Sequence, residues 1–459
     1  MTQLIDRPTS ADLSSTSAPE PSARPVPDLI TEIPGPLARA HVERDERYTS
    51  PSLPRAYPLV PVRGKGMMVE DIDGNRFLDF NAGIAVSSTG YQHPVVTAAI
   101  KAQVDDLLHF SASDFYLPVY AELAEGLDRI SPMSGPTRAF LTNSGTESVE
   151  AAMKLARHHT GRQYIVATLG GFHGRSFGAV SLTASKAKYH ARFGPMLPGV
   201  FHVPFGNQGL DELRDRVFKR LVPADEIAAF VVEPIQGEGG YIVPEDDYFA
   251  RLRALCDEHG ILLVVDEVQS GMGRTGKMWA IEHWGVEPDI LLSAKGLGSG
   301  LPIGAMLARA ELMSWHAGHH GSTFGGNPVS CAAAIATIKV IEGGLMANAG
   351  SRGEQAFAGL REMAARHTAI VKDVRGKGLM IGVAFDSGKT AEEVQWECFQ
   401  RGLLVLEAGE DAVRMSPPLI VDEAEMTTAL RIFEEAVAAV EAGRGAVGAE
   451  GVNGMEAGG

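Results

Sequence analysis

The sequence is short of cysteine, of basic residues and of long apolar runs, and each shortage excludes a class of protein. Cysteine occurs three times in 459 residues, at Cys256, Cys331 and Cys398, too few and too scattered for a zinc site or a disulfide framework. Lysine and arginine total 41 against 57 aspartates and glutamates, and this net charge of −16 argues against a nucleic-acid partner. No uncharged apolar run approaches the roughly 18 residues of a membrane span, so no membrane partner is expected.

The first residues also lack the basic start and apolar core of a secretory signal, so we expect a cytoplasmic protein. Residues 1–45 are rich in proline, serine, alanine and threonine, and 444–459 have a similar composition. Such segments bury too little apolar surface to offset their ordering entropy, and we expect both to be mobile tails. The chain between them is globular in composition and long enough for more than one domain.

Short apolar runs rich in β-branched residues predict buried strands at 228–232, 261–265 and 290–293. A helical pattern over 247–259 separates the first two and places Phe249, Leu252, Leu255 and Cys256 on one stripe. Strands that alternate with helices in this way indicate an α/β fold with a buried, mostly parallel sheet. Two long helical patterns, about 346–367 and 423–442, predict a separate α+β layer near the C-terminus.

Two charged residues follow predicted strands, at the sheet edge where the chemistry of open α/β proteins is found. Asp266 ends the 261–265 run, and an acid there is costly unless it is paired. It could face a protonated ring nitrogen, or it could pair with Arg274. Lys295 follows the 290–293 run among small residues, and burial would favour its neutral, nucleophilic amine. The alternative for Lys295 is a solvated surface lysine.

Two polar loops supply further candidates. Ser144, Gly145 and Thr146 run directly into a helical pattern, and the free N–H groups of a helix start bind anions such as a phosphate monoester. An ordinary helix cap is the alternative. Phe172, His173 and Arg175 lie between glycines. An aromatic face there could stack on a flat ring and the guanidinium could hold a carboxylate, although a loop with an exposed arginine is the plainer interpretation.

Two other patterns are rejected. Residues 271–276 match a GxGxxG dinucleotide-binding pattern, but the acidic residue that should follow a second strand is missing. The histidine pairs His158-His159 and His319-His320 lack a third ligand at metal-binding spacing. We therefore predict no metal site.

In their order along the chain, these stretches resemble the class III aminotransferases. These are fold-type-I enzymes that depend on pyridoxal 5'-phosphate (PLP) and include 4-aminobutyrate, ornithine and acetylornithine aminotransferases. The resemblance runs from about residue 46 to 442, and its most specific motifs are VVDEVQSGMGRTG and PDILLSAKGLGSG. It implies a mostly parallel, seven-stranded sheet in a large PLP-binding domain over 106–340. A smaller α+β domain would be built from both ends of the chain, over 46–105 and 341–443.

The resemblance also implies PLP as the cofactor and gives each candidate residue a role. Lys295 resembles the lysine that forms the Schiff base and moves the substrate proton, and Asp266 resembles the partner of the pyridinium nitrogen. Phe172 resembles the stacking ring, with His173 beside it. The other implied contacts are a phosphate cup of Ser144, Gly145 and Thr146, Val268 on the opposite ring face, Gln269 near the ring hydroxyl, and Thr323 lent across an interface to the neighbouring phosphate. A homodimer with shared sites follows, and a tetramer is left open.

Three residues bear on the carboxylates of the substrates. Arg414 resembles the arginine that grips an α-carboxylate, Glu238 the glutamate that pairs with it when no α-carboxylate is present, and Arg175 the holder of a distal carboxylate. This set suits an ω-amino acid as donor and 2-oxoglutarate as acceptor, because an unpaired buried arginine is costly.

The donor itself is predicted from Ile84. Ornithine aminotransferases of the class usually have a tyrosine in this stretch, and the apolar Ile84 favours a donor that lacks an α-amino group. The prediction is 4-aminobutyrate, with succinate semialdehyde and glutamate as products. The alternatives are an acetylornithine, ornithine or lysine ω-aminotransferase, and a broad-specificity amino-acid racemase, whose branch the stretch 180–186 also resembles.

Overall fold

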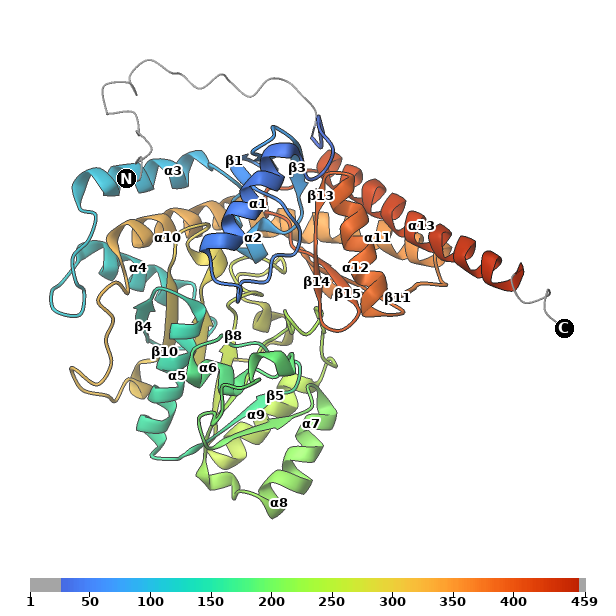
Figure 1. Cartoon of the computed structure of the whole chain (residues 1–459). Coiled ribbons are helices and arrows are strands. Elements are labelled where there is room, and N and C mark those ends of the chain that lie inside the picture. The colour runs from blue at the N-terminus through green and yellow to red at the C-terminus, as the bar shows by residue number, and fades with distance from the viewer. Residues whose placement is uncertain (1–25, 454–459) are drawn as a thin grey trace.

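The computed structural model describes residues 26–453, with the burial of side chains described through residue 443. The strands of its largest sheet are β4 (Thr137–Thr142), β5 (Tyr164–Thr168), β6 (Val200–Val203), β7 (Ile227–Val232), β8 (Leu262–Asp266), β9 (Ile290–Ser293) and β10 (Gly304–Arg309). They lie in the order β4-β10-β9-β8-β7-β5-β6 (Figure 1). Strands β5 to β9 run parallel to one another, and β10 is antiparallel to both of its neighbours.

The strands predicted at 228–232, 261–265 and 290–293 are β7, β8 and β9, and they are adjacent in the sheet. Their side chains are buried on both faces. Val264 packs in the same cluster as Val149 and Met153, whereas Leu263 and Val265 belong to the other core cluster with Phe249 and Leu252. This double burial explains why the strands are continuously apolar.

Helices cover both faces of this sheet and connect its strands. The predicted helix at 247–259 is α9, and its four stripe residues are all fully buried. Helix α10 packs against α3 and α4 at one end of the sheet. The helices of this part of the chain are α3 (Pro94–Asp106), α4 (Pro118–Arg129), α5 (Gly145–Thr160), α6 (Phe177–Leu182), α7 (Asn207–Glu212), α8 (Phe218–Arg220), α9 (Tyr248–His259) and α10 (Pro328–Val340).

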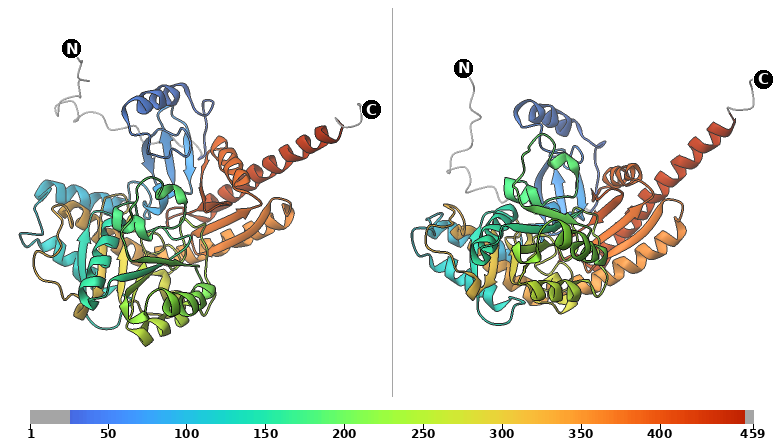
Figure 2. Two further views of the ribbon diagram at one scale, coloured as in Figure 1. Left: turned by 60° about the horizontal axis from the view of Figure 1, so that its bottom comes forward. Right: turned by 90° about the horizontal axis from the view of Figure 1, so that it is seen from below.

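The two ends of the chain meet in a second layered unit, as the resemblance implied. Its strands are β1 (Pro61–Lys65), β2 (Met68–Asp71), β3 (Arg76–Asp79), β11 (Val371–Lys377), β12 (Met380–Phe385), β13 (Leu403–Leu404), β14 (Leu406–Ala408) and β15 (Ala412–Met415). Strand β13 pairs in parallel with β3 and so joins C-terminal to N-terminal residues. Its helices are α2 (Ala82–Ala85), α11 (Met346–Arg366), α12 (Gly388–Gln400) and α13 (Glu423–Asn453). Figure 2 shows α13 projecting from this unit.

Helix α1 (Pro36–Tyr48) lies largely within the segment predicted to be a mobile tail, 1–45. Its first turn is capped from a distance, because the Asp73 carboxylate accepts hydrogen bonds of 2.8 Å from the N–H groups of Leu37 and Ala38. Helix α13 likewise continues past residue 443 to Asn453, into the predicted C-terminal tail. Residues 1–25 and 454–459 of the predicted tails lie outside the described residues.

One helical run, Pro328–Arg366, is long and apolar enough in composition to cross a membrane. Half of its most apolar window is buried within the protein. Such burial is typical of a core helix.

Candidate active site

The carboxyl ends of β7, β8 and β9 open into one cavity of about 420 Å³. The N-terminal turn of α5, the loop after β5 and the residues after β9 complete its wall. Most of the predicted site residues line it: Ser144, Gly145, Thr146, Phe172, His173, Asp266, Val268, Gln269 and Lys295. The fold therefore brings together residues that are up to 151 positions apart in the chain.

Lys295 occupies the turn directly after β9 and is half-buried. Its φ of 39° lies in the left-handed region, which is uncommon for a residue with a side chain and typical of strained functional positions. Small neighbours are needed here, since a Cβ on Gly296 would come within 2.7 Å of the Ser88 hydroxyl. Burial lowers the pKa of Lys295, while the negative charge of Glu238 opposes this shift. The amine is thus more readily neutral than that of a surface lysine.

We expect the Lys295 amine of the free protein to react with acetic anhydride with a pH midpoint below the ordinary lysine pKa of 10.5. Replacing Glu238 with glutamine should move this midpoint further down, because it removes the charge that raises the Lys295 pKa. Replacing Arg414 with glutamine should move it up, since that guanidinium lowers the pKa. Mass spectrometry of the peptide that contains Lys295, normalised to exposed Lys372, would measure the midpoint. A wild-type midpoint at or above 10.5 would contradict this prediction.

Asp266 and His173 form a buried pair at the cavity floor. The His173 Nδ1 lies 2.8 Å from Oδ2 of Asp266, and the other carboxylate oxygen accepts the N–H of Val268 at 3.0 Å. Burial by itself would lower the pKa of His173, but the hydrogen bond and charge of Asp266 outweigh it and the pKa is raised. The carboxylate therefore has partners that hold its orientation, as an acid aimed at a ring nitrogen requires.

The start of α5 has the features of an anion site. Ser144 is its N-cap residue, and its side chain makes no capping hydrogen bond. The Thr146 hydroxyl lies 2.6 Å from that of Ser176. Position 174 requires glycine, because a Cβ there would clash with the Thr146 hydroxyl. Free N–H groups and hydroxyls at a helix N-terminus suit a phosphate.

The aromatic loop gives the cavity a flat wall and a cation. Phe172 is half-buried beside the cavity, and its ring meets that of Tyr189 edge-on, with centroids 5.6 Å apart. Arg175 is exposed, and its guanidinium carbon lies 4.9 Å from the Tyr189 ring centroid and 6.0 Å from that of Phe172. Among residues 26–443 no carboxylate forms an ion pair with Arg175, so its charge faces solvent.

Glu238 and Arg414 pair across 176 positions of the chain, with Oε1 and Nη1 2.5 Å apart. Arg414 lies on β15 with only 6% of its side chain exposed, and Glu238 has 19% exposed. Burial raises the pKa of Glu238, but the guanidinium outweighs it and the pKa is lowered. Burial would lower the pKa of Arg414, but the negative charge of Glu238 outweighs burial and the pKa is raised. Both groups are therefore charged at neutral pH.

Five predicted residues lie outside the set that lines the cavity: Arg175, Glu238 and Arg414, described above, and Thr323 and Ile84. Thr323 is exposed in the segment between β10 and α10. Ile84 is 42% exposed, with a φ of 69° that is unusual for a β-branched residue. Its N–H donates to the Asn81 side chain at 3.0 Å. Within one chain, neither residue completes the cavity.

Glu233 was missed at the sequence level and lines the cavity directly after β7. It is 5% exposed, and burial raises its pKa to about 7. The sequence did contain a signal for Glu233, because Glu233 directly follows the predicted strand 228–232 just as Asp266 follows the predicted strand 261–265. Gln269 also has an unforeseen partner, because its Oε1 accepts the hydroxyl of the fully buried Tyr241 at 2.9 Å.

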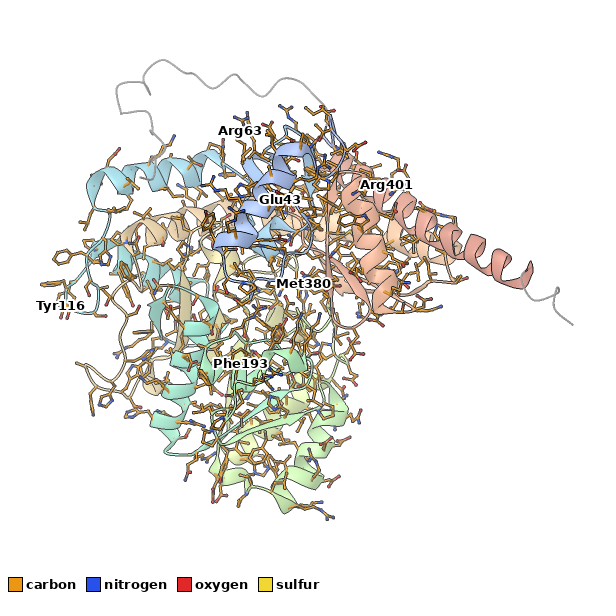
Figure 3. The ribbon with its side chains drawn as sticks, viewed as in Figure 1. Glu43, Arg63, Tyr116, Phe193, Met380 and Arg401 are labelled. Carbon is orange, nitrogen blue, oxygen red and sulfur yellow. The ribbon has the colours of Figure 1, made fainter. Side chains whose placement is uncertain are left out.

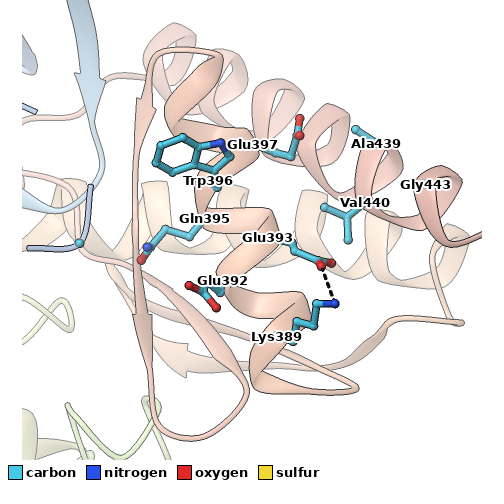
Figure 4. A pocket seen from close by; sticks show the side chains of 10 residues that line it. Lys389, Glu392, Glu393, Gln395, Trp396, Glu397, Ala439, Val440 and Gly443 are labelled. Atoms are coloured by element: carbon cyan, nitrogen blue, oxygen red, sulfur yellow. Dashed lines mark ion pairs between the residues drawn. The ribbon is translucent and has the colours of Figure 1, made fainter. Parts of the chain in front are cut away.

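A larger cavity, about 650 Å³, lies between α12 and α13 and has a different character. It is lined by surface side chains such as Trp396, Glu392 and the pair Lys389–Glu393, whose charged atoms are 3.6 Å apart (Figure 4). None of the predicted site residues lines it. Chemistry rather than volume therefore selects the cavity at Lys295.

The residues of that cavity fit PLP. Its walls offer an amine of lowered pKa for an aldehyde, a buried carboxylate for a ring nitrogen, an aromatic face and a helix N-terminus for a phosphate. Fold and site together define a fold-type-I enzyme that depends on PLP. The chain belongs to the class III aminotransferases, whose family pattern matches residues 50–437.

Relatives in this family carry several activities. The chain is 42% identical to the acetylornithine aminotransferase of a Nostoc species, over 84% of this chain and 91% of that one. It is 38% identical to the 4-aminobutyrate aminotransferase of Mycobacterium bovis, over 88% and 96%. It is 37% identical to the alanine/serine racemase of Pyrococcus horikoshii, over 90% and 92%. The ornithine aminotransferase structure from Toxoplasma gondii superposes with a TM-score of 0.81 at 32% identity, covering 88% of this chain and 96% of that one.

Proposed function

We propose that this aminotransferase moves the amino group of 4-aminobutyrate, or of a similar ω-amino acid, to 2-oxoglutarate. The observation that carries the proposal is the ion pair between Glu238 and Arg414. A donor without an α-carboxylate leaves Arg414 unmatched, and an unmatched buried charge costs several kcal/mol. Glu238 supplies the missing charge, and a 2-oxo acid would displace it with its own carboxylate.

Each of the other site residues would then have a distinct role. Lys295 would take the proton from the amine-bearing carbon of the donor and return one in the acceptor half. PLP, when bound, supplies a ring that stabilises negative charge on that carbon. Asp266 would keep the ring nitrogen protonated, and the start of α5 would hold the phosphate. Arg175, which forms no ion pair with residues 26–443, would bind the distal carboxylate of 2-oxoglutarate.

The donor is tested with the purified, PLP-loaded protein and its visible absorption band. The proposal expects 4-aminobutyrate to bleach the band and 2-oxoglutarate to restore it, with glutamate formed. Bleaching by acetylornithine, ornithine or lysine but not by 4-aminobutyrate would show that the donor is one of those compounds instead. The acetylornithine aminotransferase relative makes this the main alternative. Interconversion of D- and L-amino acids without a 2-oxo acid would favour racemisation, as in the Pyrococcus relative.

Replacing Glu238 with glutamine should change the preference between donors. We expect kcat/KM for 4-aminobutyrate to fall about tenfold to a hundredfold relative to that for glutamate, whose own α-carboxylate can neutralise Arg414. The control is Glu407→Gln, which removes a half-exposed carboxylate 4.0 Å from Lys186. Equal losses for both donors in Glu238→Gln would contradict this role.

We further propose a homodimer in which Thr323 reaches the partner's phosphate site, and a tetramer would be a dimer of such dimers. Exposed aromatic side chains support it. Figure 3 labels Tyr116 at one edge of the molecule; Phe115 precedes it in the chain and contacts Phe110 with ring centroids 4.6 Å apart, and Phe324 follows Thr323. Light scattering should give at least twice the 48.8 kDa of one chain. A cytoplasmic location belongs to the same proposal and is supported by the three free, buried cysteines.

A further inference from the structure

Glu233 connects two loops that carry substrate-binding residues. Its Oε1 accepts the backbone N–H of Phe172 at 2.9 Å, and its Oε2 accepts the backbone N–H of Gly237 at 2.8 Å. The first donor belongs to the loop after β5 and the second to the loop after β7. One carboxylate, fixed at the end of a buried strand, thus holds both loops.

Each loop carries one of the groups that distinguish the two substrates. Arg175 lies three residues after Phe172, and its guanidinium stacks near that ring. Glu238 follows Gly237 directly and pairs with Arg414. A dicarboxylate must meet Arg175, on the first loop, and Arg414, on β15 beside Glu238 of the second loop, at the same time. The separation of these loops therefore bears on how well a dicarboxylate binds.

Glu233 is also buried where an acid without a counter-ion is costly. The residue is 5% exposed, and no cation of the described chain lies within ion-pair distance of its carboxylate. Burial raises its pKa to about 7, Asp266 adds to the shift, and His173 opposes it. An acid held there without a counter-ion is costly unless its hydrogen bonds matter.

We propose that Glu233 is a positioning residue that fixes the Phe172–Arg175 loop and the Gly237–Glu238 loop at a constant separation, and thereby sets the affinity for a dicarboxylate. The inference rests on the proposed function where it assigns carboxylates to Arg175 and Arg414. The two hydrogen bonds themselves do not depend on that assignment, so the loops and the ligand can be tested separately.

The loops are tested by amide hydrogen exchange of the holoenzyme. Glu233→Ala should raise exchange about tenfold or more in peptides containing Phe172 and Gly237, because both N–H groups lose their carboxyl acceptor. Glu233→Gln keeps the shape of the side chain but replaces one acceptor oxygen by an NH₂ donor, so it should release one of the two loops. This second variant keeps the proposal testable if the alanine variant does not fold. Unchanged exchange at both peptides in Glu233→Ala would overturn the proposal.

Glu267→Gln is a matched control. Glu267 is also fully buried, burial also raises its pKa to about 7, and it accepts the N–H of Ile281 at 2.8 Å. Exchange in this variant should rise near Ile281 and stay unchanged at Phe172 and Gly237.

The ligand is tested with glutarate, an unreactive dicarboxylate, and butyrate, its monocarboxylate counterpart. Glu233→Gln should weaken inhibition by glutarate about tenfold and inhibition by butyrate much less. Equal weakening would overturn the role in dicarboxylate affinity. If glutarate does not compete with 2-oxoglutarate even in the wild type, the proposed acceptor fails, while the exchange result still decides whether Glu233 holds the loops.

Discussion

Replacing Lys295 with alanine should lower turnover by at least about four orders of magnitude while PLP still binds. The expected loss is this large because, in the proposed function, one amine would serve as both nucleophile and proton carrier, and alanine can do neither. Cofactor binding should persist, since the start of α5, the Asp266 carboxylate and the Phe172 face are unchanged. Equilibrium dialysis with PLP would measure binding, and glutamate formation would measure turnover.

The control for this variant is Lys372→Ala. Lys372 is exposed on β11, and its amine donates to the carbonyls of Thr368 and Ala369. It should turn over at nearly the wild-type rate. If Lys295→Ala kept substantial turnover, the assignment of Lys295 would be wrong, and another amine would have to be sought.

The central strands and the residues at their ends could be predicted because the information is local. Strands β7, β8 and β9 are four to six residues long and apolar throughout, except for Asp266 and Ser293 at the ends of β8 and β9. The buried apolar residues of α9 recur at helical spacing. Parallel strands place their carboxyl ends at one edge, so Asp266 and Lys295 could be expected to meet. The same rule, applied to the run at 228–232, would have found Glu233.

What could not be predicted depends on contacts between distant residues. Strand β10 enters the sheet antiparallel between β4 and β9, and no local pattern shows this order. Helix α1 begins in a proline-rich stretch because Asp73, about 36 positions away, caps it. The pair of Glu238 and Arg414 was proposed only from the resemblance, since 176 positions separate its members.

The positions of Thr323 and Ile84 illustrate a different limit. Both were assigned to the site from the resemblance, and both are exposed and outside the cavity of one chain. A site that is shared between subunits cannot be complete in a single chain. The role given to Thr323 would therefore depend on the proposed homodimer, and the light-scattering measurement bears on it directly.

Replacing Asp266 with asparagine should lower kcat by about a hundredfold to a thousandfold, the usual cost of removing one preorganised charge from an active site. Asparagine has nearly the same shape, so the loss would come from charge alone. A second effect is expected at His173, whose pKa should fall, because burial lowers it and the charge of Asp266 is what raises it. Histidine NMR of the apoprotein would measure that pKa separately from turnover.

The matched control is Asp289→Asn, which also removes an acid beside a strand of the same sheet. Asp289 accepts hydrogen bonds from Arg253 at 2.8 Å and from the N–H of Leu263 at 2.7 Å, and it does not line the cavity. Its loss should lower the unfolding temperature but leave kcat of the folded enzyme and the His173 pKa nearly unchanged. If Asp266→Asn lowered stability and turnover only as much as Asp289→Asn, Asp266 would be a structural acid. A selective loss of kcat together with a lower His173 pKa would instead show that the pair acts on the bound ring.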